Sequence, residues 1–284
     1  MIRASIRGAF ALLWFAACSG EDSSLVRGEN KLEYVPACKE EGLQHFGDTL
    51  LYCGLITSET VELLKAQDLS NVTRLVINSG GGNSNAAIEI GRQLRSHGIS
   101  VVVQNWCLSA CAQFVLPSAN EVTLMPESLV GLHHTGHALH MALTELEGLE
   151  HPAGEIASKA ELAYYEELGV APIYLDLPLR NLKVDGLVLI QPLSSDDDTE
   201  IYYAGPSFLL LDATSLERML GVRVIGTGKA DALASGDVVE ISRGVSGLYL
   251  DADDLDFDAE LARSFARLCV KRRGSAEMTC KDYQ

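Results

Sequence analysis

Two segments of the sequence share one form: an apolar strand-like run, a turn of small residues, and then a helix-forming stretch. The first extends from Val76 to Gly82 and ends in three consecutive glycines, and the second extends from Val103 to Ala112. Strands that alternate with helices across short turns form parallel sheets with right-handed crossovers. The two turns therefore predict an α/β fold, and they should lie at the carboxyl edge of its sheet, where such folds bind ligands.

Length and charge limit the classes of protein to consider. The chain has 284 residues, of which 47% are hydrophobic, which is enough for one large domain or two small ones. Its formal net charge of −17 argues against binding to nucleic acid or to an anionic membrane surface. The acidic runs Asp196–Asp198 and Asp251–Asp258 are expected to be solvated loops, with calcium binding by the second as the alternative.

The N-terminus is typical of an exported protein. Arg3 and Arg7 flank the start of a run of ten apolar residues, Gly8 to Ala17, which would cross only about half of a bilayer. Such a segment is typical of a secretory signal. Small residues precede Cys18, and this junction resembles a bacterial lipobox, in which the cysteine is lipidated. We expect a lipoprotein at the periplasmic face of the outer membrane, with a simple secretory signal as the alternative.

The same features divide the chain into four parts. Residues 1–17 are expected to be the signal peptide and residues 18–35 a lipidated tether, because the latter are mostly polar. Residues 36–250 should form the α/β domain. Residues 251–284 should form a C-terminal helix and a tail closed by cysteines.

Six cysteines remain when Cys18 is set aside, and an even number in an exported protein suggests disulfides. Six cysteines allow 15 pairings, so the sequence does not fix the connectivity. For Cys107 and Cys111, free buried thiols are the alternative. Spacing favours the pairs Cys38–Cys53, Cys107–Cys111 and Cys269–Cys280.

Apolar periodicity locates the elements. Strands are expected at Leu50–Ile56, Arg74–Asn78, Ile99–Val103, Val122–Met125, Leu129–His133, Val222–Ile225 and Val238–Ile241. Helices are expected to begin at Ser58, to cover Asn83–Gly98, Ser109–Leu116 and Thr214–Gly221, and to cover His134–Leu168 with a break near Pro152. A hairpin is expected from Leu187–Pro192 and Ile201–Leu211.

The two turns also carry candidate chemistry. Backbone N–H groups exposed where a glycine-rich turn enters a helix can bind an anion, including a developing oxyanion. Ser109 stands in the second turn, where the helix N-terminus favours negative charge. A serine there has a simpler alternative role as a helix N-cap.

The order of these motifs resembles the proteolytic subunit of Clp protease. The shared order is a strand with Asn-Ser-x-Gly-Gly, a helix, a β-branched strand, a serine-centred turn and then proline followed by histidine. The resemblance extends from about Leu51 to His133 and more faintly to Gly221. It is strongest to exported Clp-protease-like proteins with Cys-x-Ser-Ala-Cys. It implies a Clp-protease/crotonase fold, with repeated ββα units, a mainly parallel sheet and a helical handle.

The resemblance also implies roles for individual residues. Ser109 corresponds to the nucleophile, and His133, seven residues after Pro126, corresponds to the general base. The oxyanion donors correspond to the amides of Gly81 and Ala110. This pairing is chemically sound, because a serine hydroxyl needs an adjacent base to become a good nucleophile.

The third member of the triad is less well marked. In the family it is an aspartate after the handle, and Asp185 occupies roughly that place, with Asp176 and Asp212 as competitors. A Ser–His dyad is the other alternative. Gly80 stands where the family has a proline, which leaves the neighbouring N–H donor in place.

The expected function is therefore a periplasmic, lipid-anchored serine hydrolase that cleaves peptides and needs no cofactor or metal. The resemblance implies a homo-oligomer formed through the handle helices, here Gly154–Leu168, with peptides or proteins as substrates. A non-catalytic binding or assembly module on the same fold is the main alternative. Acyl-CoA binding, known from crotonase relatives, suits neither an exported nor a strongly acidic protein.

Two further chemistries use other side chains. A Ser–Lys pair would need one of three lysines to reach Ser109; these are Lys159, Lys183 and Lys229. Zinc binding would use pairs at helical spacing among His133, His134, His137 and His140. No His-Glu-x-x-His motif is present, so His134, His137 and His140 are more simply placed on the surface of a helix.

Overall fold

A computed structural model gives the arrangement of the chain. It describes residues 24–28, 31–147, 152–172, 174–175, 177–178, 187–190, 199–204, 208–242, 245–255, 267–272 and 278–282.

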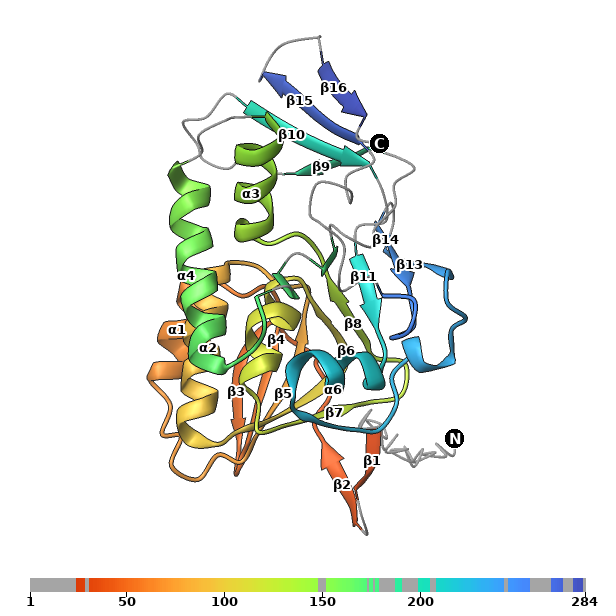
Figure 1. Ribbon diagram of the computed structural model, residues 1–284. Coiled ribbons are helices and arrows are strands. Elements are labelled where there is room, and N and C mark those ends of the chain that lie inside the picture. The colour runs from red at the N-terminus through yellow and green to blue at the C-terminus, as the bar shows by residue number, and fades with distance from the viewer. Residues whose placement is uncertain are drawn as a thin grey trace, which may run out of the picture.

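The body is built on one large, mixed sheet (Figure 1). Its strands are β3 (Gly42–Phe46), β4 (Thr49–Cys53), β5 (Arg74–Ser79), β6 (Ser100–Leu108), β7 (Glu121–Leu124), β8 (Leu129–Leu132), β11 (Phe208–Leu211), β12 (Arg223–Ile225), β13 (Val238–Ser242) and β14 (Val245–Tyr249). Along the main path the order is β13-β14-β11-β8-β6-β5-β4-β3, and β7 pairs with both β6 and β12. The pairs around β5, β6 and β7 are parallel, whereas β3–β4, β8–β11 and β13–β14 are antiparallel. The predicted α/β fold with a mostly parallel sheet is confirmed.

Helices cover the sheet and form the handle. They are α1 (Ser58–Lys65), α2 (Ser84–His97), α3 (Gly136–Glu147), α4 (Pro152–Leu168) and α6 (Ala213–Leu220). Figure 1 shows α3 and α4 side by side, extending from the body toward a second sheet. None of the helices in the described ranges is both long enough and apolar enough to cross a bilayer.

Local chemistry explains the ends of α2. The side chain of Asn83 caps the helix by accepting the N–H of Ala86 at 2.9 Å, and Gly98 ends it in the left-handed conformation with φ of 65°. Asparagine at the N-cap and glycine after the last turn are the preferred residues at these positions. The predicted bounds of this helix, Asn83–Gly98, are therefore confirmed.

The central strands are buried on both faces. In β5, Leu75 and Ile77 join the main core beneath the helices, and Val76 joins a smaller cluster on the other face. In β6, Val101 and Val103 face the main core while Val102 faces the smaller cluster. Continuous apolar runs are the expected pattern for parallel strands covered on both faces.

Strand β6 is longer than the sequence predicts, and this extension places the serine turn. The strand was expected to end at Val103 but continues to Leu108. Its first half pairs with β7, and its second half pairs with β8, where Leu108 lies opposite Gly131. The sequence does not indicate this extension, because the residues just after Val103 are polar. They form a strand only by pairing with β8, which lies more than twenty residues later in the chain.

The C-terminal region also differs from the prediction. Strands β9 (Leu187–Ile190) and β10 (Thr199–Ala204) form the expected hairpin, but β11 leaves it and joins the main sheet. The hairpin is extended by β15 (Arg267–Arg272) and β16 (Met278–Asp282) into a separate four-stranded antiparallel sheet. The predicted C-terminal helix falls partly on residues 256–266, outside the described residues.

The segment predicted as a tether contains a short pair of strands, β1 (Ser24–Gly28) and β2 (Lys31–Val35). These strands pair with each other in an antiparallel register, and they form a sheet of their own. The expected signal peptide and Cys18 lie outside the described residues.

Two of the three predicted disulfides are present. Cys38 and Cys53 are bonded with their Cα atoms 5.9 Å apart, and Cys107 and Cys111 are bonded with their Cα atoms 5.2 Å apart. Both distances lie in the normal range for disulfides. The third predicted pair, Cys269 and Cys280, faces across β15 and β16 in register.

The packing of α2 gives a direct test of the core. Leu94 is fully buried beneath α2, whereas Leu63 on α1 is 41% exposed. We expect Leu94→Ala to lower the free energy of unfolding by about 2–5 kcal/mol, through lost burial and the cavity left behind. Leu63→Ala should lower it by less than about 1 kcal/mol. Denaturant unfolding measures both, and equal losses would contradict this account of the core.

Candidate active site

Ser109 occupies a strained turn immediately after β6. Its φ of 55° is in the left-handed region, which residues other than glycine seldom adopt. Its N–H donates to the carbonyl of Gly131 at 2.9 Å, and its own carbonyl accepts the N–H of Gln113 at 2.9 Å. Strain of this kind costs about 1–3 kcal/mol and persists only where neighbouring structure imposes it. A sharp strand-to-helix turn of this type places the serine Oγ at the edge of the sheet, and Ser109 is 9% exposed there.

A disulfide and a π-helical turn flank Ser109. The disulfide between Cys107 and Cys111 closes a short loop around Ser109, and both cysteines are fully buried. The chain then enters a π-helical turn, Cys111–Val115, where the sequence predicts an ordinary α-helix from Ser109. Single π-helical turns are rare and are often found at functional sites.

His133 reaches Ser109 from the next strand. It is the residue directly after β8, whose parallel pairing with the end of β6 brings the two ends together. The Ser109 Oγ and the His133 Nε2 are hydrogen-bonded. The side-chain amide of Gln113 donates to the carbonyl of His133, which fixes the backbone at this point. The structure thus brings together the two side chains that the sequence analysis paired.

The surroundings of His133 keep its ring neutral. The ring is half-buried and packs edge-on against Phe208, with ring centres 5.5 Å apart. Loss of hydration lowers the pKa of His133 to about 4, against a smaller opposing effect of a backbone hydrogen bond with His134. A neutral imidazole can accept the proton of the serine hydroxyl, which is the property that a general base requires.

The other ring nitrogen of His133 faces a second histidine. The Nδ1 atoms of His133 and His134 are 3.4 Å apart, and burial followed by the nearness of His133 lowers the pKa of His134 well below its usual value. Within the described ranges, no carboxylate is hydrogen-bonded to His133. Asp185, the expected third member, and its competitor Asp176 both lie outside the described residues.

Asp212 is placed too far away to be the third member. It caps α6 by accepting the N–H of Ser215 at 2.7 Å, and it accepts the hydroxyl of Tyr249 at 2.8 Å. It lies at the far end of β11 from Phe208, the residue that contacts His133. Four residues of strand separate the two positions by about 13 Å.

Gly81 lies directly against Ser109. Pairing of Ser79 with Cys107 carries the following residues toward Ser109, and Gly81 has φ of 96°. A Cβ at Gly81 would lie 2.6 Å from the Leu108 carbonyl oxygen and 2.8 Å from the Ser109 Oγ. Only glycine therefore fits between the two turns.

The two expected oxyanion donors differ in their present contacts. The N–H of Gly81 donates to the Ser79 Oγ at 3.1 Å, so an oxyanion would have to replace that hydroxyl. Ala110 is the first residue of the helical turn after Ser109, with φ of −54° and ψ of −28°. N–H groups in the first turn of a helix have no partner within the helix, which suits Ala110 for an oxyanion contact.

The other side chains considered from the sequence have different roles. His137 is at hydrogen-bonding distance from Ser158, 2.7 Å from Nδ1 to Oγ, and Lys159 pairs with Glu155 on the exposed side of α4. Lys183 lies outside the described residues. In the part of the chain that the structure describes, no group of three or more histidine, cysteine, aspartate or glutamate side chains is arranged to hold a metal ion.

The handle holds the site through contacts that the sequence analysis missed. The hydroxyls of Tyr164 and Tyr165 on α4 donate to the carbonyls of Phe114 and Gln113, each at 2.9 Å. These carbonyls belong to the π-helical turn that follows Ser109. Two adjacent tyrosines in the sequence were the only available signal, and nothing local shows what they contact.

Glu161 joins α4, the predicted handle helix, to α3. Its carboxylate accepts the N–H groups of Gly136 at 3.2 Å and His137 at 2.7 Å, so it caps the start of α3. Burial raises the pKa of Glu161 to about 7, although these N–H groups act in the opposite direction. The start of α3 follows His133 and His134 closely in the chain, so Glu161 helps to position the segment that carries His133.

Comparisons with known proteins give similarities only at low identity. No model of a protein family matches the sequence, and no curated protein matches it. Solved structures with some similarity include a mutant of ClpP1 from Listeria monocytogenes, at 21% identity and a TM-score of 0.30, covering 43% of this chain and 68% of that chain. A mutant of the membrane-bound, stomatin-specific protease 1510-N is 15% identical with a TM-score of 0.36, covering 70% of this chain and 94% of that chain. A methylmalonyl CoA decarboxylase is 8% identical with a TM-score of 0.27, covering 34% of this chain and 49% of that chain.

Two adjacent glycines provide a matched test of the turn. Gly81→Ala should slow modification of Ser109 by a fluorophosphonate by about a hundredfold, because the added methyl group displaces the nucleophile. Gly80→Ala should leave the rate nearly unchanged, since a Cβ there meets its nearest atom, on Leu55, at 3.5 Å. Equal rates in the two variants would contradict the proposed contact between Gly81 and Ser109.

The low pKa of His133 predicts how reactivity depends on pH. Because the ring is the base only when neutral, and its pKa is about 4, modification of Ser109 should keep its full rate from pH 7 down to about pH 5. The rate should then fall with a midpoint near pH 4. Measuring the rate across this range in folded protein tests the prediction. A midpoint between pH 6 and 7 would show that His133 titrates like an exposed histidine.

Proposed function

We propose that this protein is a serine hydrolase that cleaves peptide bonds, with Ser109 as nucleophile and His133 as general base. The observation that carries the proposal is the hydrogen bond between the Ser109 Oγ and the His133 Nε2, at a strained turn beside Gly81. A serine that only caps a helix has no need of a neutral histidine at its hydroxyl.

The geometry supports an ordinary acyl-transfer sequence. The Ser109 Oγ attacks the substrate carbonyl while its proton passes to His133, and the oxyanion forms next to the amides of Gly81 and Ala110. One such donor is typically worth about 3–4 kcal/mol of transition-state stabilisation. His133 then gives the proton to the leaving amine, and water, deprotonated by His133, releases the acyl group from Ser109.

The third group of the site is part of the proposal. Asp185 is the proposed partner of the His133 Nδ1. In the described structure this atom lies 3.4 Å from the Nδ1 of His134. A carboxylate there would hold the ring in the correct tautomer and stabilise the imidazolium during transfer. Without it, Ser109 and His133 would act as a dyad.

Digestion of a peptide mixture tests the proposed function. We expect the wild-type protein to cleave peptides, and Ser109→Ala and His133→Ala to abolish cleavage while remaining folded. Asp185→Asn should reduce the rate if it is the third member, and Ser70→Ala, at an exposed serine, should change nothing. Mass spectrometry of the products measures all five proteins, and cleavage that survives in Ser109→Ala would refute the proposal.

One observation favours a second candidate, a binding or assembly module without catalysis. His133 contacts His134 where a hydrolase of this type has a carboxylate. Failure of the folded wild-type protein to cleave any peptide would favour this candidate, and capture of peptides without cleavage would support it.

The proposal includes export and a lipid anchor at Cys18, with residues 1–17 removed and the domain at the periplasmic face of the outer membrane. The two disulfides support export, because such bonds persist in oxidising compartments. The net charge of −17 supports contact with the membrane through the lipid alone and no role in binding nucleic acid. Association into a homo-oligomer through the handle is also proposed, and Ile156 on α4, 69% exposed, supports it.

Mass spectrometry of the protein from a bacterial host tests the anchor. We expect a mature N-terminus at Cys18 that carries acyl chains, and recovery in the membrane fraction. Cys18→Ser should remove the acyl chains and release the protein. An unmodified Cys18 in the wild-type protein would contradict the lipid anchor and leave a simple secretory signal.

A further inference from the structure

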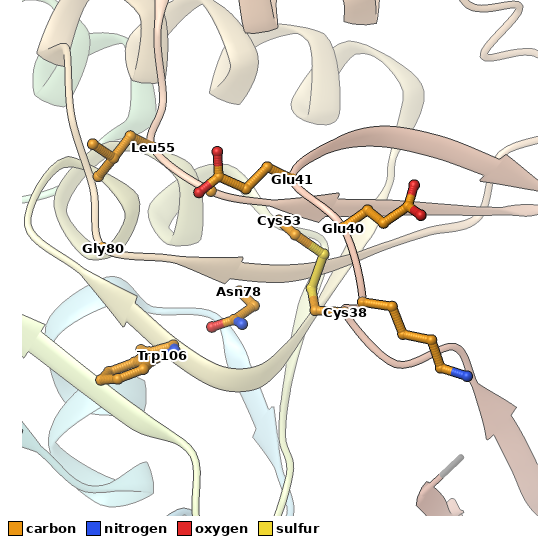
Figure 2. Close-up of a pocket in the computed structure, with 10 residues that line it drawn as sticks. Cys38, Glu40, Glu41, Cys53, Leu55, Asn78, Gly80 and Trp106 are labelled. Carbon is orange, nitrogen blue, oxygen red and sulfur yellow. A yellow bond between two sulfur atoms is a disulfide. The ribbon is translucent and has the colours of Figure 1, made fainter. Parts of the chain in front are cut away.

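A cavity of about 360 Å³ opens at the carboxyl ends of β4, β5 and β6, the edge of the sheet that also carries Ser109 (Figure 2). It is small for a ligand site, so it suits one side chain better than an extended ligand. Its walls include Glu40, Glu41, Leu55, Asn78, Gly80 and Trp106.

The cavity borders the proposed nucleophile. Gly80 lines it, and the next residue, Gly81, lies against Ser109. Standard backbone distances place the Cα of Gly80 no more than about 8 Å from the Ser109 Oγ. An extended peptide advances by about 3.3 Å per residue. A side chain one or two residues from a bond cleaved at Ser109 would therefore reach the cavity.

Two walls are apolar and exposed to a ligand. Leu55 is 66% exposed, although large aliphatic side chains are usually covered. Trp106 is half-buried and belongs to the part of β6 that lies just before Ser109. An aromatic ring and an aliphatic side chain among the lining residues suit the stem of a long side chain, and the ring face also attracts a cation.

Two of the remaining wall residues, Glu40 and Glu41, carry carboxylates that accept hydrogen bonds. The side chain of Glu41 packs over Gly54, and its nearest carbons would lie 3.7 Å from a Cβ added to that glycine. Glu40 also lines the cavity. Two carboxylates and one cation, Lys39, line the cavity. The Asn78 Oδ1 is buried and has no hydrogen-bond partner in the described structure.

The acidic wall is held in place before any ligand arrives. The disulfide between Cys38 and Cys53 ties this segment to the end of β4. Gln104 also holds this segment. Its side chain accepts the N–H of Cys38 at 2.9 Å and donates to the carbonyl of Pro36 at 2.8 Å. A wall fixed in this way loses little conformational entropy on binding.

We infer that this cavity is a specificity subsite for a basic residue of the substrate, arginine above lysine, within two residues of the cleaved bond. The inference rests on the proposed peptidase function. Arginine fits best because its stem can pack on Leu55 and Trp106 while its planar group offers several donors to the carboxylates of Glu40 and Glu41. Lysine has a single, strongly hydrated charge and gains less from an aromatic wall.

Tryptophan fluorescence tests binding without requiring catalysis. The chain has two tryptophans, Trp14 and Trp106, so the full chain carrying Trp14→Phe reports on the cavity alone. We expect arginine amide to change the emission of Trp106 and to bind about threefold to tenfold more tightly than citrulline amide, its neutral counterpart. The difference should shrink as the salt concentration rises, because exposed charges are screened.

Charge variants separate the cavity from the acidity of the whole chain. Glu40→Gln combined with Glu41→Gln should bring the two ligands to equal affinity. Glu62→Gln combined with Glu166→Gln changes the net charge equally at exposed sites that do not line the cavity, and should preserve the preference. Equal affinities in the Trp14→Phe protein, or an unchanged preference in the Glu40/Glu41 variant, would overturn the inference.

Analysis of cleavage products connects the cavity to the reaction. Sites cut by the wild-type protein should be enriched in arginine within two residues of the cleaved bond, and the Glu40/Glu41 variant should lose this enrichment while it still cleaves. Cleavage without enrichment would overturn the subsite and leave the proposed function intact. Selective binding of arginine amide without any cleavage would overturn the proposed function, and with it the role as a subsite.

Discussion

The sharp turn at Ser109 is the feature on which the rest of the site depends. The chain must leave β6, pass through a positive φ and enter a π-helical turn, and a serine does not hold such a conformation by itself. Gly131 binds the Ser109 N–H, the disulfide between Cys107 and Cys111 closes the loop, and Gly81 leaves room for the side chain. Because these constraints come from three strands and a covalent bond, the position of the hydroxyl is fixed before a substrate binds.

The handle and the sheet both hold the backbone around Ser109 and His133 in place. The tyrosines of α4 bind carbonyls of the turn after Ser109, and Glu161 of the same helix caps the start of α3, just beyond His133. One helix therefore supports both the segment with Ser109 and the segment with His133. A change in the packing of α4, such as association with another copy, would alter the positions of Ser109 and His133 through these contacts.

Much of this arrangement could be predicted because it depends on local chemistry. Asn83 and Gly98 mark the ends of α2 by capping, and the two small-residue turns mark the edge of the sheet. The order of motifs also paired Ser109 with His133, and the two side chains are in contact. Their catalytic roles stay a proposal, as does that of Asp185.

The parts that the sequence did not predict depend on distant partners. The extension of β6 to Leu108 requires pairing with β8, and the π-helical turn requires hydroxyls from α4, fifty residues further along the chain. Strand β3 was also missed, because its alternating residues become a strand only beside β4. The cavity proposed as a subsite depends on a segment before the domain core, Cys38 to Glu41, which is tied down by a disulfide and by Gln104.

The most direct test of the account is to identify the residue that a fluorophosphonate modifies. Peptide mapping of the treated, folded protein should find one adduct, on the Ser109 Oγ, and His133→Ala should remove it without unfolding the chain. An adduct on another residue, no adduct at all, or undiminished modification of Ser109 in His133→Ala would contradict an activated Ser–His pair.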